Sequence, residues 1–185
     1  MSQLLFAVLL FSTALPTPNW QQVDDPLAPA REGLVLCDGV DNAAKTCEGI
    51  VTFTFLEDGS VVGRAEAALN NDPPMYFTFD ARAETKNREI CTSVTQRDID
   101  SIQMFLGDEV FDAEQTKQLE KMVREGVAGQ VNGKVVCQRH FVDGDLRKST
   151  AFIDGAESPD LASEYVWIEK DAGYRLFTAE PILDE

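Results

Sequence analysis

The chain contains a single histidine, His140, so a Ser–His–acid catalytic arrangement would have to use it. Asp143 and Asp145 follow His140 at a turn, and Ser149 lies where a hairpin would return opposite it. No serine stands in the Gly-x-Ser-x-Gly pattern that exposes a nucleophile on a sharp turn. We therefore predict no catalytic residue and expect His140 to be a solvent-facing residue of a strand.

Carboxylates are the most abundant candidate groups, because the chain has 32 acidic residues. A glycosidase needs one protonated and one ionised carboxyl group in a cleft. Neighbours such as Asp98 with Asp100, or Asp108 with Glu109, do not reveal that arrangement from their spacing alone. We expect these pairs to lie on a solvated face or at a helix N-terminus.

Metal and phosphate motifs are absent from the sequence. Asp154, Glu157 and Asp160 cluster in one segment, and Asp143 and Asp145 flank a turn, but neither group has the spacing of an EF-hand. There is no Cys-x-x-Cys and only one histidine, which argues against a zinc site, and no P-loop glycine pattern occurs. We predict no metal and no cofactor.

The first fourteen residues have the pattern of a secretory signal peptide. Residues 4–11 form an unbroken apolar run, and Ser12 and Ala14 supply small residues before a cleavage site. The segment 1–3 lacks the usual Lys or Arg, so a retained anchor and a buried N-terminal element remain alternatives. We expect a periplasmic or secreted chain that begins at Leu15, followed by an extended lead-in over 15–32.

Export permits disulfides between the four cysteines, which allow three pairings. We favour Cys37–Cys47, which closes a short loop, and Cys91–Cys137, which ties the middle of the chain to a later strand. On the loop-entropy model these bonds contribute roughly 2.7 and 4 kcal/mol. Crossed pairings and free buried thiols remain open.

Aromatic residues alternate with aliphatic ones near the C-terminus, where Tyr165 and Trp167 stand opposite Tyr174 and Phe177 in a predicted hairpin. Tyr and Trp are favoured at protein interfaces because they combine apolar area with a polar group. Tyr165 and Trp167 are therefore the candidate binding residues. Packing in the core is the alternative for both.

The elements that must position these residues are mostly strands. Period-two alternation and short apolar runs predict strands over 33–37, 49–56, 60–68, 75–83, 88–94, 134–142 and 147–153. Asp58-Gly59 and Asp143-Gly144 predict tight hairpin turns. Residues 154–163 are expected to form an acidic loop, and 164–170 with 174–178 a third hairpin.

Two helices are predicted between the groups of strands. Thr95 can cap a helix in which Ile99, Ile102, Phe105 and Leu106 share a face and which ends at Gly107. A second helix begins at Asp112, with an apolar stripe formed by Leu119, Met122, Val123 and Val127. The order predicts an α+β fold with mainly antiparallel sheet and two central helices packed on one face. Residues 33–185 are expected to form one domain, with two subdomains meeting near 95–130 as the alternative.

The segment Cys-Asp-Gly-Val-Asp-Asn-Ala-Ala-Lys-Thr-Cys at 37–47, the later Glu89-Ile90-Cys91, and the ending from Val166-Trp167-Ile168 to Gly173-Tyr174 form a recognisable set. The sequence resembles small exported proteins of unknown function from Gram-negative bacteria over residues 34–178. This resemblance implies a periplasmic or secreted setting. It carries over no catalytic residue, ligand or partner.

The net charge of −16 indicates which classes of partner the chain can attract. A chain of that sign repels nucleic acid and anionic lipid, and it attracts basic protein surfaces. We therefore expect a non-enzymatic binding protein, with an inhibitor of a cationic exported protein such as a lysozyme or protease as one form of it. The alternatives are a periplasmic hydrolase that uses carboxylates and a structural component of the cell envelope.

Overall fold

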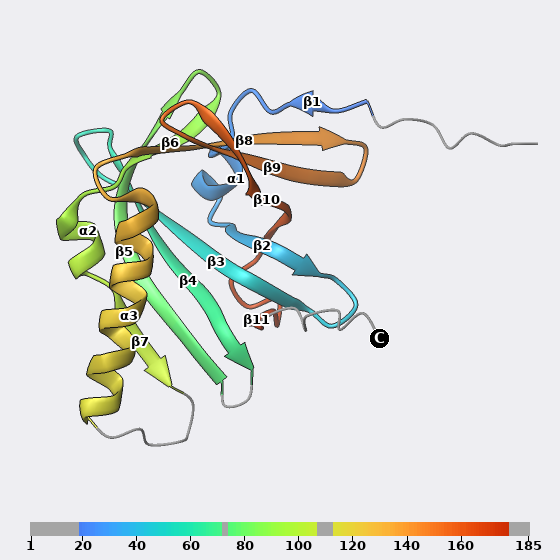
Figure 1. Ribbon diagram of the computed structural model, residues 1–185. Helices are drawn as coiled ribbons and strands as arrows, with labels where there is room; N and C mark the ends of the chain where they lie inside the picture. Colours follow the sequence, from blue (N-terminus) through green and yellow to red (C-terminus); the bar gives the residue numbers. More distant parts are fainter. Residues whose placement is uncertain (1–18, 72–73, 107–112, 178–185) are drawn as a thin grey trace, which may run out of the picture.

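The computed structural model describes residues 19–71, 74–106 and 113–177 (Figure 1). The predicted signal peptide at 1–14, Asp108 with Glu109, and the predicted helix boundaries at Gly107 and Asp112 lie outside these residues. The described elements are, in chain order, β1 Gln21–Gln22, α1 Ala28–Arg31, β2 Val35–Asp41, β3 Thr46–Phe55, β4 Val61–Asn71, β5 Pro74–Lys86, β6 Glu89–Ser93, α2 Gln96–Asp100, β7 Gln103–Leu106, α3 Ala113–Val131, β8 Val135–Asp143, β9 Leu146–Ile153, β10 Ala156–Ile168 and β11 Arg175–Leu176.

Eight of these strands form a closed antiparallel sheet. Strands β2, β3, β4, β5 and β6 pair in chain order, β6 pairs with β8, and β8, β9 and β10 continue the order until β10 pairs with β2. The segment from α2 to α3 is inserted between β6 and β8. The mainly antiparallel sheet expected from the period-two patterns is confirmed.

One end of the closed sheet is filled by α1 and the two residues before it. Leu27 and Ala30 form a cluster with Val61, Ala83 and Ile90, which come from three different strands. Phe53 and Trp167 pack against the same cluster from β3 and β10. Leu27, which precedes α1, and Ala30 of α1 therefore provide the core at this end. The extended lead-in expected over 15–32 thus contains a short helix, of which Ala30 is buried.

The predicted helix after Thr95 is shorter than expected. Thr95 caps α2 as predicted, in a capping box with Asp98, but the helix ends at Asp100. Residues 103–106, expected to be helical, form β7 and pair with Met75–Thr78 of β5. Strand β6 pairs only with residues 83–86 of β5, so the rest of that edge would otherwise lack a partner. Backbone hydrogen bonding at this free edge outweighs the helical pattern.

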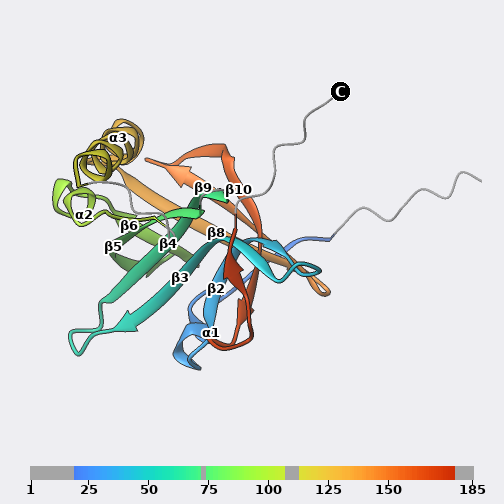
Figure 2. The ribbon, with the colours of Figure 1, turned by 90° about the horizontal axis from the view of Figure 1, so that it is seen from below.

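The packing of the helices only partly matches the prediction. Val123 and Val127 of α3 pack against Ile99 and Ile102, as the predicted stripe requires, but Met122 is 67% exposed. Helix α2 contacts β5 and α3, whereas α3 contacts β7. In Figure 2 α2 and α3 lie together at one side of the molecule, away from α1. A layer of two helices packed on one face of the sheet is not confirmed.

Two predictions for the C-terminal third are wrong. The expected acidic loop over 154–163 is largely part of β10, which pairs with β9 on both sides of an irregularity between Ser158 and Ser163. The expected third hairpin is absent from the described residues, because the end of β10 pairs with β2 and β11 pairs in parallel with β3. The segment predicted to form the first strand of that hairpin is the end of β10, and its pairing with β2 closes the sheet.

Candidate functional site

An acidic pocket of about 510 Å³ lies beside the turn between β2 and β3. Its lining consists of Gly39, Val40, Asp41, Ala44, Thr46, Glu48, Glu164 and Phe177. Three of these eight residues are carboxylates and none is basic. The pocket is therefore a concave region of negative charge with one aromatic ring.

Three parts of the chain that are distant in sequence build this pocket. Glu48 belongs to β3 and Glu164 to β10, and both strands pair with β2. Phe177 follows β11 and is held by a hydrogen bond from its N–H to the carbonyl oxygen of Cys47, at 2.8 Å. The guanidinium carbon of Arg175 lies 5.7 Å from the centre of the Phe177 ring, so a cation already contacts one face of that ring.

Gly39 is the residue whose backbone shapes the pocket. It adopts φ +60, and a Cβ atom at this position would lie 2.6 Å from Cγ of Glu48. Glycine is favoured at such an angle because it lacks the Cβ that crowds the backbone. Here it also leaves room for the Glu48 side chain, so Gly39 permits a carboxylate at this wall.

Asp38 lies next to the pocket and is more buried than the carboxylates of its lining. The Ser163 hydroxyl donates a hydrogen bond to its Oδ1. Burial raises the pKa of Asp38, the Ser163 hydrogen bond opposes this rise, and the negative charge of Glu48 adds to it. Among the described residues, Asp38 is the only carboxyl group with a raised pKa, and it lies beside Glu48, a carboxylate of the pocket.

A row of polar side chains continues from Asp38 toward His140. The hydroxyl oxygens of Ser163 and Ser149 are 2.9 Å apart, and Ser149 stands directly opposite His140 on β9 and β8. The expected proximity of His140 and Ser149 is confirmed. Within the described part of the chain, however, neither ring nitrogen of His140 has a hydrogen-bond partner. The hydroxyl of Ser149 contacts Ser163 instead, so His140 does not activate Ser149.

The prediction that His140 faces solvent is wrong. Its side chain is 1% exposed, and its ring meets that of Tyr165 edge-on with centroids 4.7 Å apart. The position faces inward because the closed sheet turns this side of β8 toward the interior. Burial disfavours the charged imidazolium and lowers the pKa of His140 to about 4.

Three of the acidic residues that the sequence offers as candidates, Asp143, Asp154 and Asp98, make local hydrogen bonds. Asp143 stands opposite Leu146, and its Oδ2 accepts a hydrogen bond from the N–H of Asn19. Asp154 accepts one from the N–H of Val135, at 3.0 Å. Asp98 caps α2, as expected of a carboxylate at a helix N-terminus. These contacts support local structure.

The candidate binding residues Tyr165 and Trp167 both point into the closed sheet. Tyr165 is 3% exposed, and Trp167 is partly buried against the α1 cluster with its ring 6.0 Å from that of Phe53. The interface hypothesis required exposed aromatic area. The burial of Tyr165 does not provide it, and the packing of Trp167 matches the alternative of a core residue.

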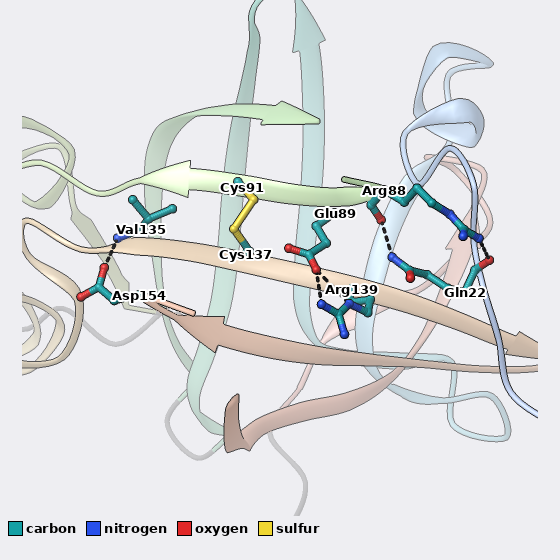
Figure 3. Close-up of a disulfide and its surroundings, with 8 residues drawn as sticks. All are labelled: Gln22, Arg88, Glu89, Cys91, Val135, Cys137, Arg139 and Asp154. Atoms are coloured by element: carbon teal, nitrogen blue, oxygen red, sulfur yellow. Dashed lines mark hydrogen bonds and ion pairs between the residues drawn. A yellow bond between two sulfur atoms is a disulfide. The ribbon is translucent and has the colours of Figure 1, made fainter. Parts of the chain in front are cut away.

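Both expected disulfides are present, Cys37–Cys47 and Cys91–Cys137. The two cysteines of the first bond are fully buried. The second joins residues that stand directly opposite each other on β6 and β8, next to the ion pair between Glu89 and Arg139 (Figure 3). Disulfides are typical of proteins that fold outside the reducing cytosol.

A second, larger groove of about 870 Å³ runs between α2 and the neighbouring face of β4, β5 and β6. Its lining mixes hydroxyl groups with charges of both signs, such as Arg82 and Asp98, and includes Cys91. Arg82 pairs with Asp58 at 3.7 Å. The groove thus has no single charge preference.

The acidic pocket is not apparent from the sequence. Phe177 is predicted there only as an aromatic residue of a hairpin, and no sequence pattern distinguishes Glu48 or Glu164. Comparison with protein-family models, with curated proteins and with solved structures found no match. No described helix is long and apolar enough to cross a membrane.

Proposed function

We propose that this protein is an exported binding protein whose acidic pocket receives a cationic group of a basic partner protein. The observation that carries the proposal is the lining of the pocket, in which Asp41, Glu48 and Glu164 are not accompanied by a basic residue. A Lys or Arg side chain of a partner fits this charge, and Phe177 offers an aromatic face to a cation. The two disulfides support export.

The charge of the whole chain supports the same class of partner. A net charge of −16 steers basic proteins toward the molecule, chiefly by raising the rate of association. Inhibition of a cationic exported enzyme is one form this binding would take. The role differs from our first hypothesis in its contact residues, since Tyr165 is buried and the pocket lies elsewhere.

A hydrolase that uses carboxylates is the second candidate, because Asp38 has a raised pKa beside Glu48. Asp38 does not belong to the lining of the pocket, and one of its oxygens accepts the Ser163 hydrogen bond. A general acid must reach its substrate, so this geometry favours binding over catalysis.

Binding of lysozyme, used as a basic probe protein, tests the proposal by biolayer interferometry. The Glu48→Gln/Glu164→Gln variant should bind more weakly than the wild type. The matched control is Glu57→Gln/Glu157→Gln, which also removes two exposed carboxylates, both outside the lining of the pocket, and should leave affinity within error. Equal weakening by both would show that only the overall charge matters and would contradict a role for the pocket.

The Arg175→Gln variant supplies an opposite test of the same site. Arg175 contacts the Phe177 ring and carries a positive charge near the pocket. Its removal should tighten binding of the basic probe, whereas weaker binding would contradict the assignment.

A further inference from the structure

The cross-strand disulfide Cys91–Cys137 lies beside a carboxylate in a compact group. The two sulfur atoms and a carboxylate oxygen of Glu89 all lie within 4.8 Å of one another. Glu89 is two residues before Cys91 on β6, so both side chains leave the same face of the strand. Within the described residues this is the one group of three potential metal-ligating side chains with such spacing.

We propose that reduction of Cys91–Cys137 opens a binding site for zinc, with the two thiolates and the Glu89 carboxylate as ligands. In a tetrahedral zinc site with two sulfur ligands and one oxygen ligand, the ligand atoms are about 3.6–3.8 Å apart, since Zn–S is about 2.3 Å and Zn–O about 2.1 Å. Small side-chain rotations bring the three atoms to that spacing once the S–S bond is broken. The fourth position remains for water or a ligand.

The backbone holds the two cysteines together without the disulfide. Strands β6 and β8 pair continuously from Glu89 opposite Arg139 to Ser93 opposite Val135, and Cys91 with Cys137 is the central pair. Strand β8 is held on its other side by β9. The thiols should therefore stay adjacent after reduction, and the ligands need little ordering to bind a metal ion.

Access and charge also distinguish this bond from Cys37–Cys47. Cys137 is partly exposed and Cys91 lines the groove beside α2, whereas Cys37 and Cys47 are fully buried. Arg139 donates from Nε and Nη2 to the same oxygen of Glu89, Oε1, so Oε2 is not used by Arg139. With Arg139 present, two thiolates, one carboxylate and a divalent ion carry no net charge, which favours their burial together.

The reductant that we propose for the protein in its own setting is a dithiol. Its thiolate attacks Sγ of Cys137 and forms a mixed disulfide, and Cys91 leaves as a thiolate that takes up a proton. The second thiol of the reductant then displaces Cys137, so the reductant becomes a disulfide and both cysteines become thiols. Zinc binding releases the two thiol protons.

The test begins with partial reduction of the full chain by a water-soluble phosphine, which is then removed without oxygen. Alkylation and peptide mapping should find Cys91 and Cys137 free and Cys37–Cys47 intact. Cobalt(II) should then give a thiolate-to-metal charge-transfer band at one ion per chain, and zinc should displace it. The Cys91→Ser/Cys137→Ser variant should give no band.

Glu89→Gln should weaken cobalt binding by more than about 10-fold, because it removes a ligand rather than a supporting contact. Glu157→Gln, which removes a carboxylate outside the group, should leave the affinity unchanged. Circular dichroism follows the sheet throughout. Absence of the band while the two thiols are free and the sheet is intact would overturn the proposal, and so would unfolding on reduction.

This site is independent of the acidic pocket, so failure of either proposal leaves the other standing.

Discussion

Two residues, Asp38 and His140, have pKa values that burial shifts in opposite directions. Burial raises the pKa of Asp38 and lowers that of His140, since in both cases the charged form loses its hydration. Asp38 offsets part of this cost through the Ser163 hydrogen bond. His140 contacts the ring of Tyr165 and remains neutral at physiological pH.

The titration of His140 should make the protein less stable in mild acid. Its pKa is about 4 in the folded state against 6.5 in the unfolded state, so the unfolded state binds more protons between these values. The free energy of unfolding should fall by roughly 3 kcal/mol as the pH drops through that window. Urea denaturation at several pH values measures it, and His140→Leu should flatten the slope.

Asp38 acts in the opposite direction and serves as the control for that experiment. Its raised pKa means that the folded state binds more protons than the unfolded state, so its contribution to stability falls as the pH rises from 3.8 to the raised value. Asp38→Asn should remove the contribution of Asp38 to the pH dependence. The free energy of unfolding should then fall more steeply in acid, because only the effect of His140 remains. An unchanged pH profile in His140→Leu would contradict the account of the buried imidazole.

Gly39→Ala should destabilise the fold through both backbone strain and crowding. A non-glycine residue at φ +60 costs about 1 kcal/mol, and contact of its Cβ with Glu48 adds to that cost. The free energy of unfolding, measured by urea denaturation, should therefore fall by roughly 2–3 kcal/mol. Gly144→Ala is the matched control, because Gly144 has φ +57 and open space around its Cα. Equal losses in the two variants would show that the Glu48 contact is unimportant.

At the level of elements, α1 is small but provides the core at one end of the closed sheet. Leu27 is fully buried among residues of several strands. Leu27→Ala should therefore lower the free energy of unfolding by about 2–5 kcal/mol. Leu161→Ala is the control, because Leu161 is 41% exposed and its truncation should cost less than about 0.5 kcal/mol. Similar small losses in the two variants would indicate that Leu27, at the start of α1, is not part of the core.

The sequence predicted elements where local pattern and tertiary pairing agree. The alternation in β3 and β5 and the cap at Thr95 were read correctly, because each depends on neighbouring residues. The helix predicted over 103–106 is wrong because the free edge of β5, which is distant in sequence, sets the conformation of these residues. Burial of Tyr165 follows from sheet closure, which local periodicity does not report.

The candidate site was hidden for the same reason. Glu48 and Glu164 are far apart in sequence and meet because β2 pairs with both of their strands. Nothing in the spacing of acidic residues distinguishes these two from the other acidic residues of the chain. The compact group at Glu89 was missed because its two cysteines are 46 residues apart, whereas the expected zinc pattern was local.

For the whole molecule, compartment and charge decide which partners it meets. We expect cleavage after Ala14, since small residues follow the apolar run 4–11. Intact-mass measurement of protein from the producing cell should give a chain beginning at Leu15. A cytoplasmic product that retains Met1 or Ser2 would contradict export and with it the proposed setting for a basic exported partner.

The most direct test of the central claim is the binding of lysozyme by the wild type and by Glu48→Gln/Glu164→Gln at two salt concentrations. Between about 0.01 M and 0.15 M salt the Debye length falls from about 30 to about 8 Å, so the association rate should fall for both proteins. Loss of the two pocket carboxylates should raise Kd by about 2- to 30-fold at the lower salt concentration, at about 0.2–1 kcal/mol for each ion pair, and by less at the higher one, because salt screens exposed pairs. Binding that is unchanged by the two substitutions would contradict the account, whatever its response to salt.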